Sequence, residues 1–386
     1  MRIKIQNGTL IADRMITGQN LYLENGRIAA ITPEDLPYDR LMDAQGQYVS
    51  PGFIDIHSHG GGGADFMDGG VEPIEQAAMM HLEHGTTTIY PTTLASSYPV
   101  LKQAVLDIGQ AMHSSKRLPH IPGAHLEGPY FSLNQSGAQN PKYITDPIPQ
   151  EYNELLELGK DIIKRWDFAP ERSGSVEFCR ELVKNGVIPG IAHSDAQYSE
   201  VKQIYENGCQ LVTHLYSGMS TIVRKGGFRI LGVVESAYLL DDMKVEMIAD
   251  GLHLPPELLQ LIYKCKGPQK ICLVTDSMRG AGMPEGPSML GRKEEAMPCI
   301  IEGGIAKLLD RTSFAGSVAT ADRLVRTCYQ QARIPLVDCV RMMTRTPAEV
   351  MGLDHTGRLE VGCDADIVIF DEDIRIKEVI LSGDSI

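Results

Sequence analysis

No stretch of the 386 residues approaches the roughly 18 consecutive apolar residues that a helix needs to cross a bilayer. The first residues, MRIKIQNGTLIADRM, alternate polar and apolar side chains and lack the continuous apolar segment of a signal peptide. These two absences predict a cytoplasmic protein that has no membrane partner.

The sequence also has fewer basic than acidic residues. The chain has 36 Lys and Arg against 50 Asp and Glu, so its formal net charge is −14 at pH 7. Nucleic-acid partners usually require a basic surface, and this balance therefore argues against them. A small anionic substrate is not excluded, because it needs only one or two local cations.

The eight cysteines are scattered, and none belongs to a Cys-x-x-Cys pair. This spacing is not that of a thiolate metal site, and it is typical of reduced, buried thiols in a cytoplasmic protein.

Both ends of the chain show short alternating segments with tight turns, whereas the middle has another character. Near the N-terminus, MRIKIQNGTLI and NLYLENGRIAAI each carry an Asn-Gly step, at residues 7–8 and 25–26, which predicts two β-hairpins. The C-terminal segment GRLEVGCDADIVIFDEDIRIKEVILSGDSI alternates in the same way.

The middle of the chain repeats a helical stretch that closes on glycine and is followed by a short apolar strand. Gly85, Gly186 and Gly208 occupy such helix ends. Strands that alternate with helices indicate parallel pairing. Eight strand candidates over about 300 residues predict an α/β TIM barrel, with strands at 52–57, 86–93, 121–127, 163–170, 187–193, 210–214, 245–250 and 271–276.

Polar side chains follow the predicted strands where each strand ends. The carboxyl ends of barrel strands converge on one face, which is where active sites of this fold lie. Imidazole and carboxylate are ligands for zinc, iron, manganese or nickel. A divalent metal site is therefore predicted from the residues at these ends, which are His57, His59, Glu127, His193, His214 and Asp276.

Two further features border this predicted site. His57 and His59 lie at i and i+2 of one strand, so both side chains can reach one ion. The glycines at 60–63 offer no side chains that would crowd a metal or substrate. His125 lies two residues before Glu127, and we expect it to orient this glutamate, with metal binding as the alternative.

Ordered motifs along nearly the whole chain resemble the amidohydrolase superfamily and, within it, the N-acetylglucosamine-6-phosphate deacetylases. The motifs are PGFIDIHSHGGGGADFMDGG, HLEGPYF, IAHSDA, THLYSGMS, ADGLHL, LVTDSM, SFAGSVATAD and TPAEVMGLDHTGRLEVGCDADIVIFD. The resemblance implies a TIM-barrel catalytic domain at 52–356 and a small β-sandwich domain built from 1–51 and 357–386.

The resemblance also implies roles for the metal-site residues. Glu127, His193 and His214 match the ligands of the main catalytic metal, and His57 and His59 match a pair that, with the glutamate, holds a second ion. Asp276 matches the catalytic acid/base beside the metal. We therefore expect one or two divalent ions per subunit, zinc first, with iron, manganese or nickel as alternatives.

The expected substrate-binding residues depart from the family pattern. Gln139 stands where the family usually has a histidine that helps polarise the substrate carbonyl, and Ser217 and Gly218 stand where sugar hydroxyls bind. His253 is expected to contact the sugar. The phosphate-pairing arginine of the family reaches in from a neighbouring subunit, which implies a homodimer, and here its place is taken by Lys225, or by Arg224 with a one-residue shift, with Arg229 as a third candidate.

These residues predict metal-dependent hydrolysis of the N-acetyl group of N-acetylglucosamine-6-phosphate or a close amino-sugar phosphate, with Asp276 as acid/base. The alternative is an amidohydrolase that acts on another N-acetyl sugar or an N-acyl amino acid and needs no phosphate site. A third possibility is a non-enzymatic scaffold on the same fold, but such proteins typically lose metal ligands, and this chain keeps them.

Overall fold

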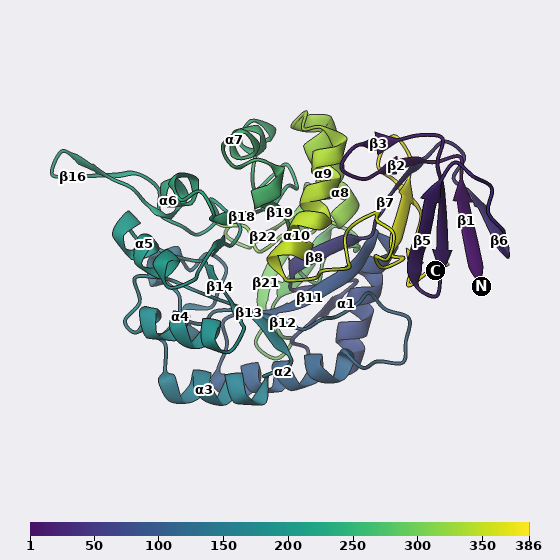
Figure 1. The fold of residues 1–386 in the computed structure, drawn as a ribbon. Helices are drawn as coiled ribbons and strands as arrows, with labels where there is room; N and C mark the ends of the chain where they lie inside the picture. The colour runs from purple at the N-terminus through teal and green to yellow at the C-terminus, as the bar shows by residue number, and fades with distance from the viewer. Residues whose placement is uncertain (386) are drawn as a thin grey trace.

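Eight parallel strands form the centre of the molecule in the computed structural model, which describes residues 1–385 (Figure 1). They pair in the order β19-β18-β15-β14-β13-β12-β11-β8. The two outer strands approach each other where the chain leaves β19, because Asp276 N donates to His57 O of β8 at 2.9 Å. The strands thus make a nearly closed barrel, and the predicted fold class is confirmed.

Each predicted barrel strand has a counterpart in the structure. The least regular is the sixth, which is reduced to two residues because the chain leaves the sheet early. The eight strands are β8 (Phe53–Ser58), β11 (Thr86–Thr93), β12 (Ala124–Glu127), β13 (Ile163–Phe168), β14 (Ile188–Ile191), β15 (Leu211–Val212), β18 (Lys244–Met247) and β19 (Ile271–Leu273).

Helices connect these strands and surround the barrel. Gly85, Gly186 and Gly208 follow helices with φ of 90°, 70° and 103°, the left-handed conformation expected of them. No helix within residues 1–385 is both long enough and apolar enough to cross a membrane. The helices are α1 (Val71–Glu83), α2 (Tyr98–Ala111), α3 (Pro149–Leu158), α4 (Ser175–Lys184), α5 (Tyr198–Glu206), α6 (Val233–Leu239), α7 (Pro256–Lys266), α8 (Ala321–Arg326), α9 (Leu336–Met343) and α10 (Arg345–Val350).

Both termini contribute to a pair of small sheets beside the barrel (Figure 1, purple and yellow). One sheet has the order β5-β4-β1-β6 and the other β25-β24-β23-β7-β2-β3. The first contains β1 (Arg2–Gln6), β4 (Asn20–Glu24), β5 (Arg27–Thr32) and β6 (Arg40–Asp43); the second contains β2 (Thr9–Ile11), β3 (Met15–Ile16), β7 (Tyr48–Pro51), β23 (Ile367–Phe370), β24 (Ile376–Leu381) and β25 (Asp384–Ser385). Ile386, in the predicted segment 357–386, lies outside the described residues.

One of the two predicted hairpins is wrong. The step at Asn25 and Gly26 does join the antiparallel strands β4 and β5, with both residues at positive φ. The step at Asn7 and Gly8 instead carries the chain from one small sheet to the other, and β1 and β2 have different partners. A β-carbon on Gly8 would lie 2.6 Å from Val49, so this glycine is needed for close packing between the sheets.

Two insertions that the sequence pattern did not predict extend from the barrel. A hairpin follows β15 and stands away from the barrel at the far left of Figure 1, consisting of β16 (Val223–Lys225) and β17 (Phe228–Ile230). A three-stranded antiparallel sheet follows β19 and consists of β20 (Gly286–Leu290), β21 (Met297–Glu302) and β22 (Ile305–Leu308).

Candidate active site

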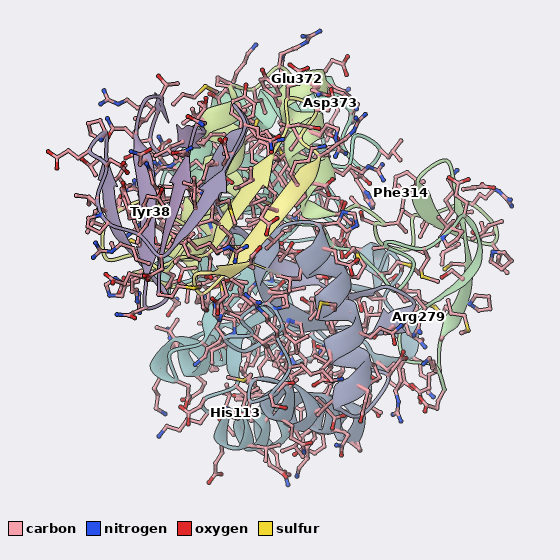
Figure 2. All side chains as sticks on the ribbon, turned by 90° about the vertical axis from the view of Figure 1, so that its right-hand side faces the viewer. Tyr38, His113, Arg279, Phe314, Glu372 and Asp373 are labelled. Carbon is pink, nitrogen blue, oxygen red and sulfur yellow. The ribbon has the colours of Figure 1, made fainter. Side chains whose placement is uncertain are left out.

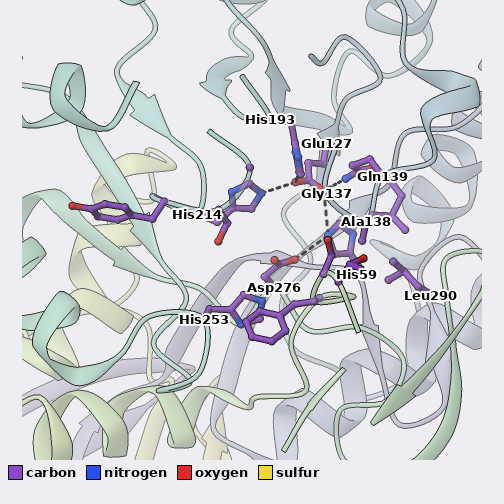
Figure 3. A pocket seen from close by; sticks show the side chains of 18 of the residues that line it. His59, Glu127, Gly137, Ala138, Gln139, His193, His214, His253, Asp276 and Leu290 are labelled. Atoms are coloured by element: carbon purple, nitrogen blue, oxygen red, sulfur yellow. Dashed lines mark hydrogen bonds and ion pairs between the residues drawn. The ribbon is translucent and has the colours of Figure 1, made fainter. Parts of the chain in front are cut away.

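Six side chains from the ends of five barrel strands meet at one mouth of the barrel, and Figure 3 shows all of them except His57. They form two groups in which ligand atoms lie within 4.8 Å of one another. The groups are His57, His59 and Asp276, and Glu127, His193 and His214. All six metal-site residues predicted from the sequence are therefore brought together.

Three of these residues have an unusual backbone that directs their side chains into the mouth. His193, His214 and Asp276 have φ of 44°, 29° and 45°. Each lies two or three residues beyond its strand, where the chain turns sharply. Such left-handed conformations are rare outside glycine and concentrate at functional sites, because only the surrounding structure holds them.

Glu127 lies between the two groups. Its Oε1 is 3.2 Å from His193 Nε2 and 3.0 Å from His214 Nε2, whereas its Oε2 is 3.3 Å from His59 Nε2. Asp276 Oδ1 closes the arrangement at 3.1 Å from His59 Nε2. The Nε2 atoms of the histidines and the carboxylate oxygens therefore face a common centre.

The hydrogen-bond partners of the Nδ1 atoms, on the side of each imidazole away from this centre, determine where its proton lies. His57 Nδ1 lies 3.0 Å from a Glu246 carboxylate oxygen, His59 Nδ1 lies 3.3 Å from the Thr92 carbonyl, and His193 Nδ1 lies 2.7 Å from the Gln135 carbonyl. These partners only accept hydrogen bonds, so each Nδ1 carries a proton, and each Nε2 is left either to donate a second proton toward the carboxylates or to present a lone pair to a metal cation.

An Nε2 lone pair and a carboxylate oxygen repel each other unless a proton or a metal cation lies between them. A donor set of imidazole nitrogen and carboxylate oxygen, with partners that orient the far side of the imidazoles, is typical of a divalent metal site. The residues therefore fit a divalent ion.

The electrostatic environment supports the same reading. Burial disfavours a charged Glu127, but hydrogen bonds from His193 and His214 hold its pKa well below the ordinary value. Burial likewise opposes a charged His214, yet Glu127 raises its pKa to about 9. The pKa of Asp276 falls to about 2 because His57 and His59 outweigh the effect of burial. Both carboxylates are ionised and attract positive charge to this point.

The site opens into a cavity of about 550 Å³, a size typical of small-molecule sites. The predicted substrate-binding residues Gln139, Ser217, Gly218 and His253 all line it. Arg224 and Lys225 lie on the exposed hairpin and do not line the cavity of their own chain. Their predicted contact with a neighbouring subunit stays a prediction.

Comparison with known proteins identifies the family. Residues 48–386 match the amidohydrolase family. The chain belongs to this family. Together with the two ligand groups, membership supports a divalent metal in this hydrolase.

Relatives of this amidohydrolase match it almost end to end. It is 32% identical over 366 residues to an N-acetylglucosamine-6-phosphate deacetylase of Lysinibacillus sphaericus, which covers 94% of this chain and 92% of the relative. It is 27% identical over 376 residues to an N-acetylgalactosamine-6-phosphate deacetylase of Escherichia coli O157:H7, covering 97% and 96%. The crystal structure of N-acetylglucosamine-6-phosphate deacetylase from Pasteurella multocida superposes with a TM-score of 0.93 at 28% identity, over 100% of both chains.

Beneath the metal-site residues, the amidohydrolase has a buried charge network that our sequence analysis missed. Arg165 Nε and Nη2 donate to the two Asp167 oxygens at 3.0 and 2.9 Å, and Arg165 Nη1 donates to Glu246. Glu246 in turn accepts from His57 Nδ1 and so orients this histidine. Three charged residues at inward positions of two apolar strands, IKRWDF and KVEM, were the available indication.

His125 belongs to this network and does not perform the expected role. Its Nε2 lies 2.8 Å from Asp167 Oδ2 and its Nδ1 lies 3.1 Å from Thr92 Oγ1. Both ring nitrogens face these residues rather than Glu127, so His125 contributes to the support below the site.

The glycine run at 60–63 also has another explanation than the one predicted. A β-carbon on Gly60 would lie 2.2 Å from Ala64 O, and one on Gly61 would lie 2.0 Å from Met80 Cε. These glycines allow β9 (Gly60–Gly61) to pair with β10 (Ala64–Asp65) and to pack against α1. They do not line the cavity.

Proposed function

We propose that this amidohydrolase removes the acetyl group of N-acetylglucosamine-6-phosphate, or of a close amino-sugar phosphate, and releases acetate and glucosamine-6-phosphate. The observation that carries the proposal is the convergence of Glu127, His193, His214 and Asp276 on one cavity. Relatives that match the chain over nearly its whole length are named as deacetylases of such sugars.

Glu127, His193 and His214 would hold the main metal ion, and His57 and His59 would hold a second one with Glu127 as the shared ligand. We propose zinc as the metal, because imidazole and carboxylate ligands suit it; iron, manganese and nickel accept the same ligands. When bound, such an ion supplies a Lewis acid for the amide carbonyl and makes water more acidic.

Asp276 is proposed as the proton carrier. The ionised carboxylate accepts a proton from the attacking water and then donates it to the nitrogen of the departing amine. Its Oδ1 lies 3.1 Å from His59 Nε2, so the carboxylate is held beside the reacting groups. One residue can serve both steps because the first step leaves it protonated.

Gln139 is proposed to orient Glu127 through a hydrogen bond, since its side chain carries no charge. Its Nε2 donates to Glu127 Oε2 at 2.6 Å, and its Oε1 accepts from Ala95 N at 2.7 Å. The neutral amide thereby orients Glu127 at the wall of the cavity. Ser217, Gly218 and His253 would contact the sugar; His253 Nδ1 is held by Asp250 Oδ2 at 2.8 Å, which leaves Nε2 free to face the ligand.

The protruding hairpin supports the proposed homodimer. Three apolar side chains lie exposed on or beside it, with exposed fractions of 51% for Ile222, 50% for Val223 and 77% for Phe228. We expect sedimentation to show a dimer and Phe228→Asp to shift the chain toward the monomer, since a charge in an apolar contact is unfavourable. A wild-type monomer would contradict the proposal.

The central test measures acetate release from N-acetylglucosamine-6-phosphate, its unphosphorylated form and the galacto epimer, with metal analysis on the same sample. We expect turnover of a phosphorylated sugar, one or two ions per subunit, and loss of activity after chelation that zinc restores. Equal rates with and without phosphate would favour the alternative amidohydrolase without a phosphate site. Absence of acetate release from all three compounds would refute the proposed function.

A further inference from the structure

The ligand group of His57, His59 and Asp276, which we call the first group, spans the two ends of the barrel sheet. The two histidines lie at the end of β8, whereas Asp276 follows β19. Within residues 1–385, no strand ladder joins β8 to β19, because they are the outer strands of the sheet. The other three ligands come from β12, β14 and β15, which the continuous ladder from β12 to β15 holds together. Contacts other than strand pairing must therefore fix Asp276 relative to the histidines.

Backbone hydrogen bonds join residues 59–63 to residues 277–281, and we call this contact the barrel seam. Ser277 O accepts from His59 N at 2.8 Å and from the next backbone N–H at 3.0 Å. Arg279 O accepts from the last backbone N–H of the glycine run at 2.8 Å. Figure 2 shows Arg279 on the side of the molecule that carries the pale green insertion, away from the purple sheet. The glycine run therefore lies against the segment that follows β19.

Buried side chains add a second set of hydrogen bonds at the barrel seam. Ser277 Oγ donates to Gly60 O at 3.1 Å and lies 3.1 Å from Ser58 Oγ. It also lies 3.1 Å from Thr275 Oγ1, which donates to Asp55 Oδ2 at 2.5 Å. The four side chains are fully buried, and none of them lines the cavity. The network thus connects β8 to the segment after β19 without entering the space for the substrate.

His81 of α1 reaches this network from outside the barrel sheet. Its Nε2 lies 3.1 Å from Gly60 O, 3.1 Å from Ser58 Oγ and 3.2 Å from Ser277 Oγ. Gly60 O can only accept, so Nε2 carries a proton and donates it to this hydrogen bond. Burial lowers the pKa of His81 to about 4, so the imidazole is neutral at pH 7. Its Nδ1 has no hydrogen-bond partner in the part of the chain that the structure describes, so the imidazole acts through Nε2.

The glycine run allows α1 to approach the barrel seam this closely. A β-carbon on Gly61 would lie 2.0 Å from Met80 Cε and 3.3 Å from His81 Nε2. A side chain at this position would displace Met80 and crowd the imidazole. The absence of a side chain at Gly61 is therefore a condition for the hydrogen bond between His81 and Gly60 O.

We infer that His81 and Ser277 are positioning residues that hold the end of β8 against the segment after β19 and thereby fix the first group. The distance that they set is the one from His59 Nε2 to Asp276 Oδ1, which is 3.1 Å. This distance decides whether one ion can contact both side chains. The inference rests on the proposed function for its activity measurement alone. The other three ligands should be independent of the barrel seam, because strand ladders hold them.

The test compares His81→Phe and Ser277→Ala with His81→Gln, in which the amide nitrogen can replace Nε2 as the donor to Gly60 O. Ser236→Ala is the matched control, because Ser236 is a fully buried serine of α6 that donates to Gly232 O at 2.6 Å and does not line the cavity. Zinc dissociation constants of the metal-free chain are measured by competition with a chelator. On the same proteins, kcat and KM are measured for N-acetylglucosamine-6-phosphate at saturating zinc, and the urea midpoint is measured without metal.

His81→Phe and Ser277→Ala should each raise the largest zinc dissociation constant about 10- to 100-fold, the usual effect of losing a hydrogen bond that orients metal ligands. We expect kcat to fall by a similar factor. KM should stay within about 2-fold, because the residues expected to meet the sugar follow other strands. His81→Gln should recover most of both losses, and Ser236→Ala should change neither quantity by more than about 2-fold.

The outcomes separate this inference from the proposed function. If both His81→Phe and Ser277→Ala keep zinc affinity and kcat within about 3-fold of the wild type, whatever the urea midpoint, the positioning role is refuted and the function stands. Equal losses in Ser236→Ala would also refute it, because the effect would then be one of general stability. If the wild type deacetylates no sugar, but zinc affinity falls in the two variants and returns in His81→Gln, the function is refuted and the positioning role stands.

Discussion

Asp276→Asn should lower kcat for acetate release by about 10³-fold, within the range for loss of a general acid/base. The substituted amide keeps the size of the side chain but cannot accept and return a proton. The backbone bonds of residue 276, to His57 O and from Ser317 N, both at 2.9 Å, do not involve the side chain. We therefore expect the fold and most of the bound metal to persist, as checked by circular dichroism and metal analysis.

Asp322→Asn is a suitable control for this variant. Asp322 is also a buried aspartate, but it bonds to Thr320 and Arg326 and lies outside the cavity. Its replacement should change kcat by less than about 3-fold, in line with a residue that has no part in proton transfer. Full activity of Asp276→Asn would refute the proton-carrier role. A loss of activity that parallels a loss of metal would instead assign Asp276 to metal binding.

Arg165→Met should reduce the free energy of unfolding by about 3–5 kcal/mol, the usual effect of removing one partner from a buried ion pair. Arg165 is fully buried, and its removal leaves Asp167 and Glu246 without their cation inside the barrel. The loss is measured by urea denaturation. Glu246 then no longer has a fixed position for orienting His57, so metal content should fall as well.

A surface pair provides the comparison. Arg2 pairs with Glu24 at 2.8 Å, with side-chain exposures of 32% and 36%, and Arg2→Met should cost less than about 1 kcal/mol. Adding Asp167→Asn and Glu246→Gln to Arg165→Met should recover part of the stability, because the unpaired charges are then absent. An Arg165→Met variant as stable as Arg2→Met would show that the network does not support the barrel.

The barrel was predictable because its signals are local. A helix that closes on a glycine such as Gly186 and a short apolar strand after it can be read within about 20 residues, and the repeat of this unit restricts the topology to parallel strands. Once the strands close into a barrel, residues at their ends must meet. His193 and His214 therefore belonged to one predicted site although no local feature connects either of them to Glu127.

The errors concern features that depend on distant neighbours. The Asn-Gly step at residues 7–8 has the same local pattern as the one at 25–26, but only the pairing of β1 and β2 with strands of different sheets shows that it joins two sheets. The glycine run was assigned to the substrate, whereas Met80 of α1 is the neighbour that requires Gly61 to lack a side chain. Sequence spacing carries no information about such contacts.

The sequence by itself determined the alternation of strands and helices, the residue types at the strand ends, and hence the expectation of a metal-dependent hydrolase. Only the tertiary structure decided which atoms face one another: the Nε2 atoms of His193 and His214 toward Glu127, and the guanidinium of Arg165 toward Glu246. The physical reason is that periodicity and turn chemistry act over a few residues, whereas hydrogen bonds and ion pairs act over a few ångströms between segments that can be 200 residues apart, as His57 and Glu246 nearly are.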